Sequence, residues 1–262
     1  MKRIVLFLGL VFLSFATCFA SKPVEKQSLA IVFIGNSITQ GALMQNPVQD
    51  APPAQTAVYL QAQEGVGSVN FANCGVSGCT TVDYLPASNT LFAKAQQSAD
   101  KLNVDGTAQL IFSIMLGTND SAVKGPNGAP VSPVQYRTNI KVIVDELMSL
   151  YPHCLVVLHR PLWYSPNTYN SAIYLAEGLQ RIERYLPELE SLVAAYATSN
   201  PQRVYMGDKD GFDYFKVNYL TDLVAESGNA GTFYLHPTVQ GATRLSQFWG
   251  QAIMKSIQSK IN

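Results

Sequence analysis

Three short polar clusters, each directly after an apolar run, hold the residues of this sequence that are best suited to chemistry. They are Gly35–Thr39, Asn73–Gly78 and Gly117–Asp120. They contain a serine that could act as a nucleophile, and a glycine and an asparagine that could donate hydrogen bonds to an oxyanion. With a histidine as the base, such a set would suit attack on a carbonyl carbon and acyl transfer.

Ser37 is the candidate nucleophile because it stands where a strand ends and a helix begins. The free backbone donors and the positive dipole end at such a place suit a nucleophile that faces a developing oxyanion. Ser37–Gln40 is also a capping box, in which the serine caps the helix and the glutamine reaches back. Both interpretations need the same local geometry.

Gly78 and Asn119 are the candidate oxyanion donors. A glycine in a turn lets its backbone N–H approach a ligand closely, and the side-chain amide of an asparagine has two donors. The structural alternatives are an ordinary turn glycine and an Asn119 or Asp120 that caps a helical turn.

His236 is the candidate base, largely by elimination among three histidines. His153 precedes the fourth predicted strand and so lies at the wrong end of the sheet. His159 ends that strand and could reach the pocket, but a structural role is favoured for it. His236 precedes Pro237, which favours an extended backbone and suits the start of the final helix.

The clusters can meet because apolar runs alternate with helical stretches, which predicts a three-layer α/β/α doubly wound domain with a mainly parallel sheet of about five strands. The predicted strands are Leu29–Ile34, Val69–Ala72, Leu110–Leu116, Leu155–Leu158 and Val204–Met206. The predicted helices lie near Ala54–Ala62, Leu91–Leu102, Pro133–Leu150, Ser171–Ser199 and Val239–Ile261.

This pattern resembles the SGNH hydrolases, the GDSL-type esterase and lipase superfamily, from about Leu29 to Trp249. The resemblance implies that Ser37 is the nucleophile and His236 the base. It also implies an oxyanion hole formed by Gly78, Asn119 and the backbone N–H of Ser37, with no cofactor and no metal. The chain is similar to secreted bacterial carbohydrate O-acetylesterases, including those that act on sialic acids.

The sequence departs from the family pattern at two positions. Asn36 stands where the first block usually has aspartate, a change for which we expect little consequence. Phe233 stands where an aspartate usually precedes the histidine by three residues. Because that acid orients the imidazole, its loss requires a substitute. Asp222, Glu226 or a backbone carbonyl could serve, and the sequence does not choose among them.

The substrate prediction is a short acyl ester, such as an O-acetyl group, on a glycan. Arg160 could pair with a sugar carboxylate through its planar fork, or it could hold a loop through carbonyl contacts. Trp163 and Tyr164 could stack on a sugar or belong to the core. The alternative functions are a glycan-binding protein with impaired catalysis, and a lipase or thioesterase of the same fold. Acyl length, alcohol and oligomeric state stay open.

The composition limits the partners and the compartment. The 262 residues include 18 Lys+Arg and 18 Asp+Glu with no basic block, so a nucleic-acid partner is not expected. Residues 1–20 predict a signal peptide, and residues 21–262 a single domain that is periplasmic or secreted. The apolar run of about 12 residues is too short for a stable membrane span, which needs about 20.

The cysteines leave two questions open. Cys18 allows a lipid-anchored form as an alternative to the cleaved and soluble one. Cys74 and Cys79 are the only local pair that could form a disulfide, although three buried thiols, with Cys154 as the third, are the simpler interpretation. No Cys/His spacing resembles a zinc site.

Overall fold

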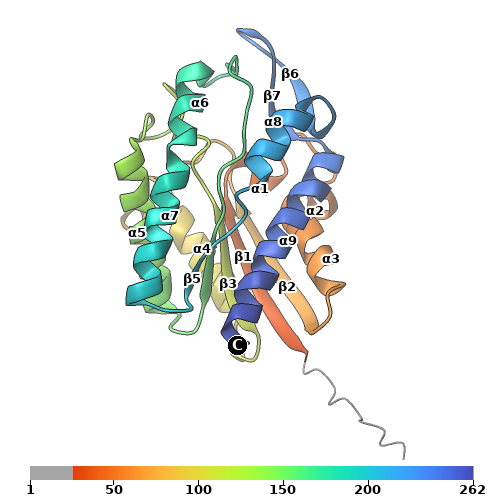
Figure 1. The fold of residues 1–262 in the computed structure, drawn as a ribbon, viewed down its shortest axis with the longest axis vertical. Helices are drawn as coiled ribbons and strands as arrows, with labels where there is room; N and C mark the ends of the chain where they lie inside the picture. Colours follow the sequence, from red (N-terminus) through yellow and green to blue (C-terminus); the bar gives the residue numbers. More distant parts are fainter. Residues whose placement is uncertain (1–25, 262) are drawn as a thin grey trace, which may run out of the picture.

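The centre of the molecule is a five-stranded parallel sheet with the order β2-β1-β3-β4-β5 (Figure 1). The computed structural model describes residues 26–261, and the predicted signal peptide lies outside them. The strands are β1 (Gln27–Gly35), β2 (Val66–Gly75), β3 (Gln109–Met115), β4 (Leu155–Leu158) and β5 (Val204–Met206). The predicted fold class is therefore confirmed.

The three inner strands are apolar on both faces because helices cover both sides of the sheet. All residues of β3 and β4 are buried, as are the last seven residues of β1. The order of the strands reverses next to β1, where Gly35 is level with Gly75 of β2 and with Met115 of β3. The polar clusters that follow these strands therefore share one edge, at the topological switch point.

The helices form two layers around this sheet. Figure 1 shows α5 and α7 on one side and α3 and α9 on the other. The longer helices are α3 (Pro52–Gln61), α4 (Leu91–Leu102), α5 (Pro133–Leu150), α6 (Leu175–Glu183), α7 (Tyr185–Ser199), α8 (Gly211–Asp222) and α9 (Val239–Ile261), and the short ones are α1 (Ser37–Gln40), α2 (Pro47–Asp50) and η1 (Pro86–Ser88). Within residues 26–261, no helix has the length and apolar content needed to cross a membrane.

The helix predicted over Ser171–Ser199 is two helices and a preceding loop. The break falls at Arg184, because Pro187 has no N–H to donate to the carbonyl of Glu183. Residues 171–174 do not begin the helix, because Ile173 forms an isolated antiparallel bridge with Lys124. These residues instead become part of a loop above the sheet.

An antiparallel hairpin that the sequence analysis did not predict precedes the last helix. It consists of β6 (Leu223–Gly228) and β7 (Gly231–Pro237). Figure 1 places it beyond the carboxyl ends of the strands of the main sheet. The pairing shifts between Leu223 and Ala225, so that Leu235 and His236 together stand opposite the single residue Val224. This bulge re-aims the side chains next to it.

Candidate active site

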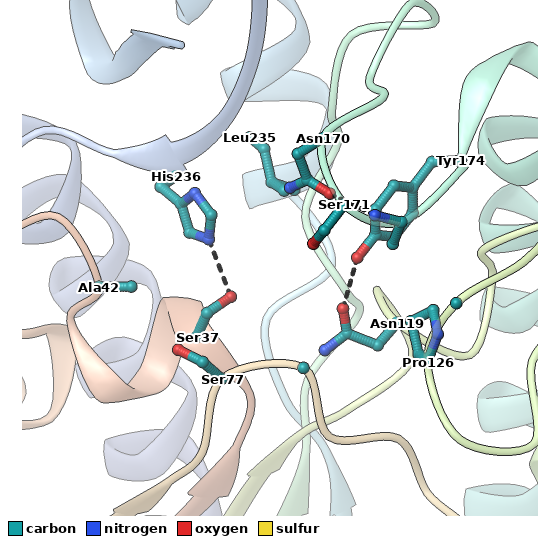
Figure 2. A pocket seen from close by; sticks show the side chains of 13 residues that line it. Ser37, Ala42, Ser77, Asn119, Pro126, Asn170, Ser171, Tyr174, Leu235 and His236 are labelled. Carbon is teal, nitrogen blue, oxygen red and sulfur yellow. Dashed lines mark hydrogen bonds between the residues drawn. The ribbon is translucent and has the colours of Figure 1, made fainter. Parts of the chain in front are cut away.

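A cavity of about 520 Å³ lies at the edge where the three clusters meet. Figure 2 shows the side chains that line it. Apart from His236, none of its side chains belongs to a residue type that is charged at neutral pH. The lining residues are Ser37, Ala42, Ser77, Gly78, Asn119, Gly125, Pro126, Asn170, Ser171, Ala172, Tyr174, Leu235 and His236.

Ser37 and His236 lie 199 residues apart in the chain and are hydrogen-bonded, with 2.9 Å between Ser37 Oγ and His236 Nε2 (Figure 2). Ser37 is the first residue of α1, and Asn36 is its N-cap, because Asn36 Oδ1 accepts from the N–H of Ile38 at 3.0 Å. The predicted capping box is therefore wrong. The Ser37 hydroxyl is free for the histidine because the preceding residue caps the helix.

The Gln40 side chain also differs from the capping-box prediction. Its Oε1 accepts from the N–H of Ser77 at 2.8 Å and from the Ser77 hydroxyl at 2.6 Å. At Gly75 the two clusters approach so closely that a Cβ would come within 2.3 Å of the Gln40 nitrogen. Gln40 therefore ties the first cluster to the second instead of closing its own helix.

Glu226 provides the acid next to the imidazole. Its Oε1 lies 2.9 Å from His236 Nδ1 and also accepts from the His236 backbone N–H at 3.2 Å. The side chains are 14% and 10% exposed, so water weakens this pair little. Phe233, at the usual acid position, is buried in the core, and Asp222 is bonded to Tyr214, Thr221 and Gln240 instead.

The three predicted oxyanion donors all border the cavity. Gly78 has a φ of +79°, a conformation that favours glycine. Within the described residues, the N–H groups of Ser37 and Gly78 donate to no other protein group. Asn119 is buried, and its Nδ2 donates to the carbonyl of Cys79 at 2.7 Å, which leaves its second amide hydrogen without a partner there.

Asp120, in the third cluster, is bonded to the segment that follows the second cluster. Its carboxylate accepts hydrogen bonds from the backbone N–H and the hydroxyl of Thr81. Thr81 also accepts from Asn139 Nδ2 on α5 at 2.8 Å. Burial raises the pKa of Asp120 to about 6. The residue after Asn119 is therefore a structural support, which the sequence analysis considered only as a helix cap.

Arg160 does not border the cavity. Its Nη1 lies 3.3 Å from the Lys209 carbonyl and 3.3 Å from Asp213 Oδ2, and its guanidinium stacks on Phe212 at 3.8 Å. These contacts match the alternative in which the arginine holds a loop, and they give no support to binding of a sugar carboxylate. Trp163 and Tyr164 are buried and also lie outside the lining.

His159 is enclosed in the core. Its Nε2 lies 2.9 Å from Ser113 Oγ, and its Nδ1 accepts from the Asp208 N–H at 3.0 Å. Burial lowers its pKa to about 3, so it stays neutral.

Cys74, Cys79 and Cys154 are free thiols. In the described part of the chain, no group of three or more His, Cys, Asp or Glu side chains is placed to hold a metal ion.

Several cavity residues were not anticipated from the sequence. Asn170, Ser171 and Tyr174 line the wall opposite Ser37, and Glu226 was only one of three options. Residues 171–174 lie within the predicted helix, so their pattern carried no signal of a binding loop.

Comparisons with known proteins agree with this architecture. A family model described as GDSL-like lipase/acylhydrolase matches residues 33–244. No curated protein matches the chain. Among solved structures, the lipase/acylhydrolase from Enterococcus faecalis has a TM-score of 0.54 at 20% identity, covering 87% of this chain and 96% of that one.

Two further structures share the fold. The carbohydrate acetylesterase Est24 from Sinorhizobium meliloti has a TM-score of 0.56 at 16% identity, covering 87% of this chain and 99% of that one. The family 3 carbohydrate esterase from Clostridium thermocellum has a TM-score of 0.57 at 17% identity, covering 90% and 100%. At these identities the likeness establishes the fold.

Proposed function

The chain belongs to the GDSL-like lipase/acylhydrolase family, whose members hydrolyse esters, and on that premise we propose that it removes short acyl groups, such as acetyl, from a neutral carbohydrate. The observation that carries the proposal is a chain of two hydrogen bonds that begins at the wall of the cavity. Ser37 Oγ lies 2.9 Å from His236 Nε2, and His236 Nδ1 lies 2.9 Å from Glu226 Oε1.

The proposed reaction follows from the positions of these groups. Ser37 Oγ attacks the ester carbonyl while its proton passes to His236 Nε2, and Glu226 stabilises the imidazolium. The oxyanion is held by the N–H groups of Ser37 and Gly78 and by the amide of Asn119. His236 then protonates the departing alcohol. It next takes a proton from water, whose oxygen attacks the acyl carbon, and returns that proton to Ser37 Oγ as the bond between this oxygen and the acyl group breaks.

The lining of the cavity supports a small neutral substrate. The residues next to Ser37 are small, and the opposite wall offers the amide of Asn170 and the hydroxyl of Ser171 as partners for sugar hydroxyls. No arginine or lysine of residues 26–261 lines the cavity, so a carboxylate such as that of sialic acid has no charged partner there within this range. The similarly folded proteins from S. meliloti and C. thermocellum are carbohydrate esterases, which agrees with a glycan substrate.

The test of catalysis is hydrolysis of para-nitrophenyl acetate by the wild type, Ser37→Ala and His236→Ala. We expect both variants to retain less than about a thousandth of the wild-type kcat. Asp222→Asn is the matched control, because it alters a carboxylate near the hairpin that does not contact His236. An active Ser37→Ala protein would refute the mechanism, and an inactive wild type would favour a binding protein.

The test of the substrate class is the release of acetate from an acetylated neutral oligosaccharide and from an O-acetylated sialic acid at equal concentration. We expect a higher kcat/KM for the neutral sugar. The reverse preference would refute the proposed substrate while leaving the serine mechanism intact.

We also propose that the enzyme acts outside the cytoplasm as a single domain of residues 21–262. The proposal is supported by the signal-peptide pattern of residues 1–20. A polymeric or glycan-linked ester would be accessible there.

A further inference from the structure

The Asn119 side chain is held by two hydrogen bonds of opposite sense. Its Nδ2 donates to the Cys79 carbonyl at 2.7 Å, and its Oδ1 accepts from the Tyr174 hydroxyl at 2.6 Å. The residue is 3% exposed. Figure 2 shows the Tyr174 hydroxyl pointing at Asn119 Oδ1, with Asn119 Nδ2 pointing away from Tyr174.

The orientation of this amide decides whether it can stabilise an oxyanion. The two ends of the amide have nearly the same size, but Nδ2 donates and Oδ1 only accepts. With Oδ1 turned toward the cavity, Asn119 would repel the negative charge that forms on the substrate. A donor that occupies Oδ1 therefore favours the productive orientation, and it also polarises the amide so that Nδ2–H donates more strongly.

Tyr174 is suited to this task by its surroundings. It ends the loop before α6, is 4% exposed, and packs edge-on against Tyr164 with 5.4 Å between ring centroids. Its backbone N–H donates to the Thr168 carbonyl at 3.2 Å, which ties the residue to its own loop. Burial raises the pKa of Tyr174, so its hydroxyl keeps the proton that it donates. Among the described residues, Asn119 Oδ1 is the only hydrogen-bond partner of the Tyr174 hydroxyl.

We propose that Tyr174 is a positioning residue of the oxyanion hole, which acts by holding the Asn119 amide with its Nδ2–H available to the substrate oxygen. This inference rests on the proposed function of Asn119. It assigns a role to the loop that follows β4, which is distant in sequence from the three clusters but contacts Asn119 in the folded chain.

The experiment is a double-mutant cycle on acetate ester hydrolysis with Tyr174→Phe and Asn119→Ala. We expect Tyr174→Phe to lower kcat about five- to tenfold with little change in KM, which is the size of one lost hydrogen bond. In the Asn119→Ala background, the same change should have no further effect on kcat, because the group that Tyr174 orients is gone.

Tyr164→Phe is the matched control. It removes a buried phenol hydroxyl from the same aromatic pair, one that contacts Ser121 Oγ at 2.8 Å instead of a cavity residue. We expect its kcat to stay within about twofold of the wild type, with a loss of stability like that of Tyr174→Phe. Denaturant unfolding of both variants separates a loss of folded protein from a loss of turnover.

Three results would overturn the inference. They are an equal loss of kcat in Tyr164→Phe and Tyr174→Phe, an undiminished effect of Tyr174→Phe in the Asn119→Ala background, and a raised KM at constant kcat, which would indicate direct contact between Tyr174 and substrate. If Ser37→Ala or Asn119→Ala kept full activity in the same assay, the proposed function itself would fail, and this outcome is distinguishable from all three.

Discussion

Glu226 and His236 illustrate how the proposed catalytic set can be complete although one of its usual positions is apolar. The usual acid position is occupied by Phe233, which is part of the hydrophobic core. The carboxylate comes instead from the facing strand of the hairpin, and the bulge at Leu235 and His236 brings the imidazole into its reach. The orientation of a histidine depends on where the acceptor atom lies in space and not on where the acidic residue stands in the sequence.

The first prediction concerns this carboxylate. We expect Glu226→Gln to lower kcat about 100- to 10,000-fold, because a neutral amide stabilises the imidazolium poorly and allows the wrong tautomer. The measurement is steady-state hydrolysis of the acetate ester over a range of pH. Asp222→Asn serves as the control, and equal activity of the wild type and Glu226→Gln would contradict the assignment.

The second prediction concerns the backbone donor at Gly78, where a Cβ would meet nothing within 4 Å although φ is positive. Alanine would therefore strain the backbone without a clash, at a cost of about 1 to 2 kcal/mol. We expect Gly78→Ala to lower kcat about tenfold or more by displacing the donor.

Gly106→Ala provides a matched control for this substitution. Gly106 also has a positive φ and open space at its Cβ, but it lies in the loop before β3 and outside the catalytic cavity. We expect a similar loss of unfolding free energy and unchanged kcat. If both variants lost activity alike, Gly78 would have no special role.

At the scale of elements, the hairpin and the loop before α6 act as one unit. Asn167 Nδ2 donates to the carbonyls of Ala230 and Thr232 at 3.2 and 2.7 Å. The Asn229 N–H donates to the Tyr169 carbonyl at 2.7 Å, and Ser165 Oγ accepts from the Tyr234 N–H at 2.9 Å. The loop that orients Asn119 thus also holds the strands that carry Glu226 and His236.

The third prediction tests this unit. We expect Asn167→Ala to lower kcat several-fold and to accelerate amide hydrogen exchange in residues 228–236, because two bonds that clasp the hairpin are lost. Exchange in α9 should not change. Asn218→Ala, which removes a bond inside α8, is the control. Unchanged exchange in the hairpin of Asn167→Ala would contradict the coupling.

The fourth prediction concerns His159, which follows β4 and is bonded to Ser113 on β3 and to Asp208 in the segment after β5. Its folded pKa of about 3 is below its ordinary value of 6.5, so only the unfolded state binds the proton between these values. The neutral His159 therefore stabilises the protein above about pH 6.5, and this contribution declines as the pH falls toward 3.

His159→Asn removes the titrating group while keeping a polar side chain. We expect the difference in unfolding free energy between the wild type and this variant to shrink on acidification, with a slope approaching about 1.4 kcal/mol per pH unit. Comparison of the two proteins is essential, because burial raises the pKa of Asp120 and Asp208 to about 6 and these groups act with the opposite sign. A pH-independent difference would contradict the prediction.

At the level of the whole molecule, the strand order decides where the cavity lies. The reversal at β1 leaves a crevice at the carboxyl ends of the strands, and the hairpin and the 165–174 loop build its upper walls. The absence of net charge agrees with an enzyme that does not attract polyanions or steer charged substrates.

The fifth prediction concerns export of the whole chain. We expect the mature protein from a bacterial host to begin at Ser21 and to stay in the soluble extracytoplasmic fraction, as measured by intact mass and fractionation. Cys18→Ser should leave both results unchanged. Retention in the membrane fraction that Cys18→Ser abolishes would favour the lipid-anchored form instead.

The alternation of strands and helices could be predicted from the sequence, because short, mostly apolar runs bounded by Gly, Asn or Pro and separated by helical stretches are typical of buried parallel strands. All five strands of the main sheet were predicted in place, and the clusters after them followed from the shared edge. The positions of Ser37, Gly78, Asn119 and His236 around one cavity agree with that reasoning.

The surroundings of these residues depend on how separate elements pack and could not be predicted. The choice of Glu226 over Asp222 depended on a one-residue bulge, and the position of Tyr174 depended on a loop that its own pattern assigned to a helix. The position of Arg160 against Phe212 likewise depended on a distant helix. Local periodicity reports which face of an element is buried, whereas the contact of two side chains depends on how separate elements pack, and that information is spread over the whole chain.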